Sequence, residues 1–465
     1  MPLGRTWQVA AGSAAIGLAV AAGTAVAAGP WESGRRTAER TRAAALDRQR
    51  HPAPAAPAAT AAPPPPLAAQ VLAPVPAAAA PATGGSGPSA ALPAALTARL
   101  DQLMAAPGLG HAPTGAVTDV ASGRLLYGHG ADTPGTPASV TKLATAVAAL
   151  TALGPEHRLT TTVVRTAPDR VVLVGGGDPT LELTGLAADT AAALKAAGTT
   201  SVTLAYDTSY FAGPAQHPIG PNENLALVTA LMVREGRLDG SSSGPATRAD
   251  DPAKAAAVRF AALLRRHGVT VRGTPAPGSG KGGARLAAHG SAPLADLVER
   301  MLTNSDNDLA EALVRQTALA TGRPATFAGG AAAVRAELAR YGVPLTGAVF
   351  TDGSGLARAD RLSPRTLAAL LALAASPAHP QLRPVLTGLP VAAFTGTLTS
   401  RFTGGPGAGL VRAKTGTLTG VNTVAGTVLT RSGRLLAFSF MADDASSPAD
   451  AQAALDALAT ALARS

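Results

Sequence analysis

The sequence contains no cysteine among its 465 residues. This absence excludes a disulfide framework, a cysteine-ligated zinc or iron–sulfur site, and a thiol nucleophile. Any covalent chemistry would have to use serine, threonine, lysine or a carboxylate. Aromatic residues make up only 3% of the chain, so a core must be built mainly from alanine, valine and leucine. The same scarcity argues against stacking platforms for single-stranded nucleic acid.

Lysine is the second scarce residue type. Arginine supplies nearly all of the 39 basic residues, and the five lysines are Lys142, Lys195, Lys254, Lys281 and Lys414. The formal net charge is +10, of which residues 1–50 contribute +4 through seven arginines and three acids. The other +6 is spread over 415 residues, which is too thin for the clustered basic surface that nucleic acid requires. We therefore expect no nucleic-acid partner.

Residues 1–30 have the features of an export segment. The 20 residues 9–28 carry no charge, and residues 25–27 (Ala-Val-Ala) form a small-residue pattern typical of a cleavage site. The run is also long enough to span a membrane, so cleavage and membrane anchoring by the N-terminus remain two alternatives. Residues 31–91 begin with charges and continue as an Ala/Pro-rich stretch, which is typical of an extended linker.

Globular sequence begins near residue 92. The expected strands include 115–119, 124–127, 171–174, 410–417, 423–430 and 434–441, and the expected helices include 138–153, 253–267, 293–301, 308–318, 364–374 and 449–463. Strands at both ends with helices between them predict an α/β fold of the α+β type, with an antiparallel sheet flanked by helices. We expect this domain to consist of residues 92–160 and 291–465, interrupted by an inserted, mostly β domain at residues 161–290.

Signatures of bound metals and cofactors are missing. The eight histidines show no paired ligand spacing such as His-Glu-x-x-His. Residues 278–282 resemble a phosphate loop, but Gly282 stands where a magnesium-binding serine or threonine is needed. No Gly-x-Ser-x-Gly elbow occurs, which weakens a Ser-His-Asp hydrolase. We expect no cofactor and no metal.

A first catalytic candidate is Ser139-Val140-Thr141-Lys142, at the start of the expected helix 138–153. A spacing of three residues puts Ser139 and Lys142 on one helical face. Serine needs a base to become a nucleophile, and lysine can be that base if burial and a nearby cation lower its pKa. Arginine stays protonated, so a lysine is informative in a chain that otherwise uses arginine. A solvated lysine on a helix is the alternative interpretation.

A second candidate, Ser305-Asp306-Asn307, lies between two expected helices. A short turn there would aim the hydroxyl of Ser305 and the carboxamide of Asn307 into the same cleft. Such residues also favour turns and helix caps without any catalytic role.

The third candidate, Lys414-Thr415-Gly416, lies in the expected strand 410–417. Lys414 offers a positive charge, and Thr415 offers a hydroxyl for a substrate carboxylate. Gly416 would leave room for an extended ligand at the strand edge, or else it marks a bulge. Each motif is weak alone, but their order, their contexts and the use of two of only five lysines make the combination strong.

In this order the motifs resemble those of the penicillin-binding proteins and serine β-lactamases: Ser-x-x-Lys, Ser- or Tyr-x-Asn, and Lys-Thr-Gly. Over roughly residues 92–462 the chain is similar to the low-molecular-mass class C penicillin-binding proteins, the D-alanyl-D-alanine carboxypeptidase/endopeptidases of the DacB type. The supporting strings are Gly177-Asp178-Pro179-Thr180, Ser305-Asp306-Asn307-Asp308-Leu309-Ala310-Glu311, Asp352-Gly353-Ser354-Gly355-Leu356, and Val411-Arg412-Ala413-Lys414-Thr415-Gly416-Thr417-Leu418.

The resemblance implies a transpeptidase/β-lactamase-like fold and a set of catalytic roles. Ser139 would be the acylated nucleophile and Lys142 its general base. Ser305 would relay a proton, and Asn307 would hold a substrate amide.

The resemblance also implies the substrate contacts. Lys414 and Thr415 would help to bind the terminal carboxylate, within a substrate-binding strand that includes Gly416 and Thr417. Backbone N–H groups of Ser139 and Thr417 would form the oxyanion hole.

The function implied is a serine D,D-peptidase that acts on peptidoglycan stem peptides through an acyl-enzyme and is inhibited by β-lactams. Such an enzyme would work outside the cytoplasm, secreted or anchored at the outer face of the membrane. Carboxypeptidase and endopeptidase action both remain open, because both attack a D-Ala carbonyl and differ only in the leaving group. A serine β-lactamase and a non-catalytic wall-binding protein are the competing hypotheses.

Overall fold

The fold is taken from a computed structural model that describes residues 91–465. The predictions for residues 1–90, an export segment and a linker, lie outside the described residues. Within residues 91–465, no helix is both long and apolar enough to cross a membrane.

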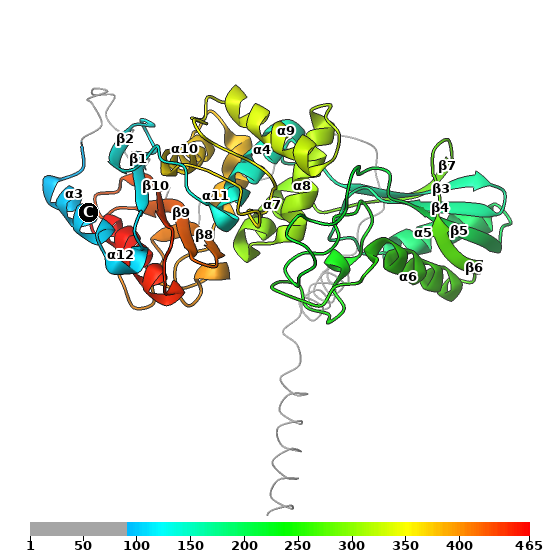
Figure 1. The fold of residues 1–465 in the computed structure, drawn as a ribbon. Coiled ribbons are helices and arrows are strands. Elements are labelled where there is room, and N and C mark those ends of the chain that lie inside the picture. Colours follow the sequence, from blue (N-terminus) through cyan, green and yellow to red (C-terminus); the bar gives the residue numbers. More distant parts are fainter. Residues whose placement is uncertain (1–90) are drawn as a thin grey trace, which may run out of the picture. The chain divides into compact units, whose positions relative to one another are not determined.

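A five-stranded antiparallel sheet contains the first and the last strands of the described chain (Figure 1). Its order is β2-β1-β10-β9-β8, with β1 at Thr114–Asp119, β2 at Leu125–His129, β8 at Val411–Leu418, β9 at Val421–Leu429 and β10 at Leu435–Ala442. Thr114 of β1 lies opposite Met441 of β10, so the first strand pairs with the last. β8 is the last strand on one side of the sheet, and an isolated bridge between Val391 and Arg412 covers part of its outer edge.

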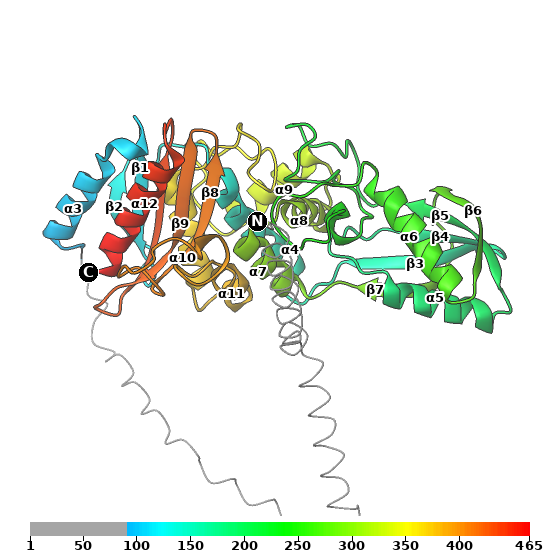
Figure 2. The same cartoon turned by 90° about the horizontal axis from the view of Figure 1, so that it is seen from below.

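Helices cover both faces of this sheet (Figure 2). α3 (Ala94–Met104) and α12 (Pro448–Ala463) lie on one face, and α10 (Pro364–Ala375) lies on the other. Because both faces are covered, β9 is buried at every position but its last. Its sequence is accordingly a nearly continuous run of small and β-branched residues rather than an alternation of apolar and polar ones.

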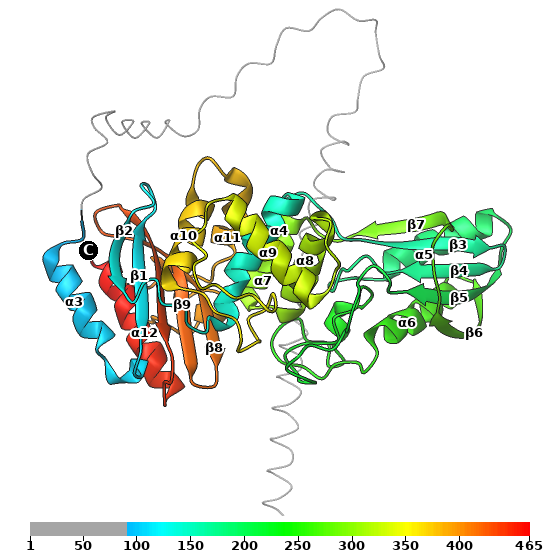
Figure 3. The same ribbon diagram turned by 45° about the horizontal axis from the view of Figure 1, so that its top comes forward.

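A layer of helices beside the sheet surrounds α4 (Lys142–Leu153), whose first nine residues are all buried (Figure 3). The other members are α7 (Leu294–Asn304), α8 (Asn307–Ala320), α9 (Phe327–Arg340) and α11 (Arg383–Thr387). The core of this layer consists mainly of leucine, valine and alanine, as the scarcity of aromatic residues predicts. Close helix packing compensates for small side chains: a methyl group on Gly330 of α9 would overlap Val314 of α8.

A second five-stranded sheet is built only from residues between Thr160 and Gly290. Its order is β6-β5-β4-β3-β7, with β3 at Thr160–Ala167, β4 at Arg170–Val174, β5 at Ser201–Asp207, β6 at Thr270–Pro277 and β7 at Ala284–Gly290. α5 (Thr184–Ala196) and α6 (Pro252–Arg266) pack with these strands around a separate apolar core. The predicted division into a body and an inserted domain at 161–290 stays a prediction, and this separate core supports it.

Residues 208–251, between β5 and α6, contain almost no regular secondary structure and contact the helical layer. Arg315 of α8 is fully buried and fixes the start of this segment by donating hydrogen bonds to the carbonyls of Ala212 (2.8 Å) and Pro214 (3.0 Å). We call residues 208–251 the connecting segment. Through it, the part of the chain that carries the second sheet reaches the candidate site.

Candidate active site

Ser139 lies in a 3-10 turn, Ala138–Thr141, that precedes α4. The sequence predicts one helix from residue 138, but the α-helix begins only at Lys142. Ala138 has a φ of +50°, a left-handed conformation that a residue with a side chain adopts only when its surroundings hold it there. The turn presents the half-buried Ser139 directly ahead of the buried helix.

The side-chain amine of Lys142 is fully buried and has three hydrogen-bonding neighbours. Its Nζ lies 3.0 Å from Ser139 Oγ, 2.7 Å from Asn307 Oδ1 and 2.7 Å from the carbonyl oxygen of Ser354. The oxygens of Asn307 and Ser354 can only accept hydrogen bonds. A neutral amine has two N–H groups and one lone pair, so these two acceptors direct the lone pair toward the Ser139 hydroxyl.

Burial lowers the pKa of Lys142 to about 8. Negative charges oppose this shift and raise the pKa of Lys142 again, in the order Asp352, Glu311, Asp306 and Asp308. A lysine with this pKa exists partly as the neutral amine near neutral pH, which is the form that can accept a proton.

Ser305 and Asn307 flank the junction of two helices. Ser305 ends α7 in a left-handed conformation (φ +58°), and Asp306 caps α8 by accepting a hydrogen bond from the N–H of Leu309. Asn307 is the first residue of α8, and its Nδ2 donates to the backbone carbonyl of Asn224 in the connecting segment (2.9 Å). That bond orients the carboxamide so that its oxygen faces Lys142.

Lys414 is fully buried in β8, and its Nζ donates to Ser305 Oγ (2.9 Å) and to the carbonyl of Thr415 (2.7 Å). Burial lowers the pKa of Lys414 well below its ordinary value, and the positive charge of Lys142 lowers it further. Among the residues that the structure describes, no carboxylate offsets this shift, in contrast to Lys142. Lys142 and Lys414 are thus each bonded to one of the two serines of the site.

The outer edge of β8 is partly covered. The N–H of Ala413 bonds the carbonyl of Pro390, so by the two-residue repeat of a strand the backbone groups of Thr415 and Thr417 face the same outer side. The hydroxyl of Thr415 bonds Thr397 Oγ1 (2.8 Å). The edge is therefore closed by the chain's own residues up to Ala413 and open from Thr415 onward.

Gly416 has a different role from the one expected. A side chain there would meet the carbonyl oxygen of Pro137 at 2.7 Å and the amide nitrogen of Ser139 at 3.0 Å. The hydroxyl of Thr423 in β9 is closer still, so the space beside Gly416 is filled by Thr423 and by the turn that carries the nucleophile candidate. Glycine is needed because β8 and this turn touch through their backbones.

A cavity of about 220 Å³ joins these groups. It is lined by Ser139, Asn224, Arg237, Ser243, Gly244, Pro245, Asn304, Ser305, Asp306, Asn307, Asp308, Leu356 and Thr417. Of the predicted site residues, Ser139, Ser305, Asn307 and Thr417 line it directly, while the buried amines of Lys142 and Lys414 bond to that lining. The connecting segment supplies one wall of this cavity, and the sequence did not predict that contribution.

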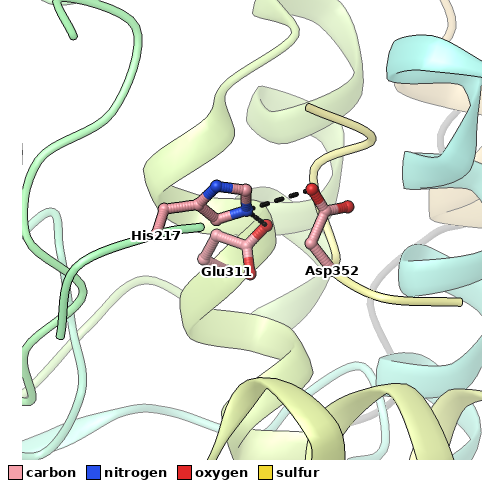
Figure 4. A group of neighbouring side chains, drawn as sticks. All are labelled: His217, Glu311 and Asp352. Atoms are coloured by element: carbon pink, nitrogen blue, oxygen red, sulfur yellow. Dashed lines mark hydrogen bonds and ion pairs between the residues drawn. The ribbon is translucent and has the colours of Figure 1, made fainter. Parts of the chain in front are cut away.

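Behind Lys142 lies a buried cluster of His217, Glu311 and Asp352 (Figure 4). His217 Nε2 lies 3.1 Å from Asp352 Oδ2 and 3.9 Å from Glu311 Oε1. Asp360 bonds Asp352 in turn, and burial together with the charge of Asp352 raises the pKa of Asp360 to about 8. Asn307 and Glu311 are four residues apart, so they lie on the same face of α8. This spacing could have indicated Glu311 from the sequence.

A second buried group ties the connecting segment to the Ser305-Asp306-Asn307 turn. Glu235 is fully buried and bonds Arg237 (2.7 Å) and Arg300. Arg248 pairs with Asp308 at 2.9 Å. Burial raises the pKa of Glu235, and the arginines oppose that rise. This network holds the cavity wall against α8.

Both acidic groups have the composition of metal ligands, but neither fits a metal ion. His217 Nδ1 accepts a hydrogen bond from the N–H of Ile219 (3.3 Å), so Nε2 carries the proton and donates to Asp352. A metal at Nε2 would require the other tautomer, with a proton pointing at the N–H of Ile219. In the second group, guanidinium cations already occupy the space between the carboxylates.

Comparison with known proteins assigns the family. The model of the D-Ala-D-Ala carboxypeptidase 3 (S13) family matches residues 96–239 and 233–463. The chain belongs to this family. The predicted family, the fold class and the serine-type carboxypeptidase class are thereby confirmed.

Curated S13 relatives and a solved structure agree. Carboxypeptidase DacB of Mycolicibacterium smegmatis is 37% identical over 370 residues, 75% of this chain and 80% of that protein. D-alanyl-D-alanine carboxypeptidase of Actinomadura sp. is 30% identical over 453 residues, 78% of this chain and 84% of that protein. Penicillin binding protein 4 (dacB) of Haemophilus influenzae has a similar fold, with a TM-score of 0.65, 23% identity and coverage of 78% of this chain and 97% of its own.

Proposed function

We propose that this S13 carboxypeptidase cleaves the terminal D-Ala-D-Ala bond of peptidoglycan stem peptides through an acyl-enzyme at Ser139. The observation that carries the proposal is the 3.0 Å contact between Ser139 Oγ and the buried Nζ of Lys142. A serine hydroxyl is activated by a base within hydrogen-bond reach, and this lysine has its pKa lowered to about 8.

In the acylation step, neutral Lys142 accepts the proton of Ser139 Oγ while that oxygen attacks the penultimate D-Ala carbonyl. Negative charge develops on the carbonyl oxygen, which the backbone N–H groups of Ser139 and Thr417 stabilise. The C–N bond breaks, and the proton that Lys142 took up passes through the hydroxyl of Ser305, which bonds Lys414, to the leaving amine. Water then attacks the ester, the proton steps run in reverse, and Ser139 is released.

The carboxylate of the leaving D-Ala is placed at Thr415, beside Lys414. The leaving group then faces the end of β8 that Pro390 and Thr397 cover, and the acyl part faces the open edge at Thr417. A peptide that continued along the strand beyond its terminal carboxylate would meet Thr397. This supports removal of a terminal D-amino acid over cleavage inside a longer peptide strand.

A peptidoglycan-acting family places the reaction outside the cytoplasm. Secretion or anchoring through residues 1–30 would deliver the enzyme there, with the Ala/Pro-rich linker as a spacer. β-Lactams are the proposed inhibitors, since the solved Haemophilus influenzae protein of the same fold is described in complex with a β-lactam.

The decisive test uses purified protein, a fluorescent penicillin, a linear D-Ala-D-Ala pentapeptide and a cross-linked stem dimer. We expect one label per protein, lost in Ser139→Ala, and release of D-Ala from the pentapeptide. Persistent labelling of Ser139→Ala would reject the nucleophile. Rapid turnover of penicillin would favour the β-lactamase, and splitting of the dimer would show endopeptidase action. Absence of both labelling and hydrolysis would favour a wall-binding protein.

A further inference from the structure

Glu311 is fully buried in α8, one helical turn after Asn307. Its Oε1 accepts hydrogen bonds from the backbone N–H groups of Gly353 (3.0 Å) and Ser354 (2.8 Å). The side chain therefore clamps the turn around residues 352–355 onto α8. A side chain on Gly353 would meet the carbonyl oxygen of Ala310 at 2.7 Å, so the turn packs tightly against α8 on this side.

The clamped turn holds the helix that carries the base. The carbonyl of Ser354 accepts from Lys142 Nζ, and the carbonyl of Gly353 accepts from Thr145 Oγ1, both at 2.7 Å. Lys142 and Thr145 are three residues apart in α4, so both bonds fall on the same face of the helix. A continuous set of hydrogen bonds thus runs from Glu311 through the turn to the amine beside Ser139.

His217 closes the cluster on its far side. Its ring packs edge-on against Phe327, with centroids 5.2 Å apart, and its Nε2–H donates to Asp352 (Figure 4). Asp352 also accepts from the N–H groups of Gly355 and Ala357, each at 2.7 Å. The charge of Asp352 is therefore well solvated by the protein.

The charge of Glu311, by contrast, is poorly solvated by the protein. Its Oε2 is buried without a hydrogen-bond partner, and within residues 91–465 no arginine or lysine forms an ion pair with it. A glutamine would accept the same two N–H bonds from Gly353 and Ser354 without the cost of a buried, poorly solvated charge. The clamp alone therefore does not explain a carboxylate at this position.

We propose that Glu311 is a positioning residue of the D,D-peptidase site, which holds Lys142 through the turn at Gly353 and Ser354 and sets by its charge the pH range in which Lys142 can accept a proton. The inference rests on the proposed role of Lys142 as the base. It adds a residue behind the amine that touches neither Ser139 nor the cavity.

The titratable and charged groups around Lys142 come from every element packed against it. They are Asp306, Asp308 and Glu311 from α8, Asp352 and Asp360 from the 351–360 loop, Lys414 from β8 and His217 from the connecting segment, with Arg237, Arg248, Arg300 and Arg315 around the acids. Asp306 and Asp308 are paired with arginines, and Asp360 bonds Asp352. Within residues 91–465 Glu311 has no arginine or lysine at ion-pair distance, although Arg315 of the same helix interacts with its charge from further away.

Glu311 and Lys142 titrate in overlapping pH ranges. Burial, followed by the charge of Asp352, raises the pKa of Glu311 to about 7, and the pKa of Lys142 is about 8. While Glu311 is ionised it favours protonated Lys142. Once Glu311 takes up a proton, that stabilisation is lost and Lys142 gives up its own proton more easily. The two groups should therefore titrate as a coupled pair, and activity should fade gradually on the acid side.

The test measures the rate of acylation by labelled penicillin from pH 5 to 9 in wild type, Glu311→Gln and Glu311→Ala. Glu311→Gln keeps the clamp and removes the charge, so the acid midpoint should move down by roughly half to one pH unit. Glu311→Ala loses the clamp, and its maximal rate should fall by about tenfold or more at every pH. Glu337→Gln is the matched control, because Glu337 is a buried helical glutamate bonded to Arg340 and to no site residue.

A Glu311→Gln enzyme with the wild-type midpoint would overturn the charge role, and a Glu311→Ala enzyme with the wild-type maximal rate would overturn the clamp. If Glu311→Gln does not fold, the pH profile of the wild type still tests the coupling. A fall in acylation rate at acid pH as steep as that of a single-proton titration would contradict it. Failure of the proposed function is distinguishable, because penicillin would then fail to label the wild type or would still label Ser139→Ala, whatever the Glu311 variants do.

Discussion

Gly416 and Ser139 touch through their backbones: a methyl group on Gly416 would stand 3.0 Å from the amide nitrogen of Ser139. That amide is one of the two proposed oxyanion donors. Gly416→Ala should therefore displace it and lower the acylation rate by about 100-fold, the usual effect of losing one such donor. Stopped-flow measurement with a fluorescent penicillin checks this.

The control for Gly416→Ala is Gly185→Ala in α5, where the added methyl group meets nothing within 4 Å. Alanine favours a helix over glycine, so this variant should keep full activity and gain up to about 1 kcal/mol in the free energy of unfolding. A Gly416→Ala enzyme as active as the control would show that this contact does not position the donor.

Ser305 allows the hydroxyl and the backbone to be tested separately. Its φ of +58° is unfavourable for alanine and easy for glycine. Both Ser305→Ala and Ser305→Gly remove the hydroxyl that bonds Lys414, and both should lose about 100-fold or more in acylation. Alanine keeps the backbone strain that serine already bears and glycine relieves it, so the thermal midpoint should be higher for Ser305→Gly than for Ser305→Ala. Retained activity in Ser305→Gly would exclude a proton relay through this residue.

The pKa of about 8 for Lys142 predicts the direction of the pH dependence. The base must be neutral, so acylation should rise with pH through 8 and fall as the pH drops below it. Lys142→Arg keeps a charge but cannot accept a proton, and it should be as inactive as Lys142→Ala. A pH–rate profile for the three proteins is the measurement, and an active Lys142→Arg enzyme would point to another base.

The ion network around Glu235 should be more important for stability than a surface pair of the same chemistry. Glu235 is fully buried and pairs with Arg237, whose side chain is also buried, so Glu235→Ala leaves a buried guanidinium without its partner and should cost about 3–5 kcal/mol. Glu182 forms a similar pair with Arg234, but its side chain is 44% exposed, so Glu182→Ala should cost under about 1 kcal/mol. Urea unfolding of both variants gives the comparison, and equal losses would contradict it.

The elements with strong periodicity were predictable. The three C-terminal strands and the helices α6, α8, α10 and α12 lie within three residues of the expected ranges. α9 was not among the expected helices, and its sequence contains two glycines, Gly329 and Gly330, which have low helix propensity. In the fold, Gly330 is the residue that lets α9 approach Val314 of α8, so tertiary packing overrides its low helix propensity.

The candidate site was only half visible in the sequence. Residues that touch the cavity through short motifs, such as Ser139 and Asn307, could be found because their spacing reflects local structure. His217 and Asn224 come from a segment without periodicity, and only the tertiary fold brings them to α8. The carbonyl of Asn224 acts through its backbone, so no residue type at that position could have indicated its role.

The pairing of β1 with β10 constrains the order in which the chain can fold. Thr114 lies opposite Met441, so the first sheet stays incomplete until nearly the whole chain is present, whereas the second sheet needs only residues 160–290. Contacts so distant in sequence form slowly, and meanwhile the β1–β2 hairpin exposes an unpaired edge. During synthesis from the N-terminus, the edge of β1 that pairs with β10 therefore stays exposed until β10 is present. Until then it must be kept from pairing with other chains.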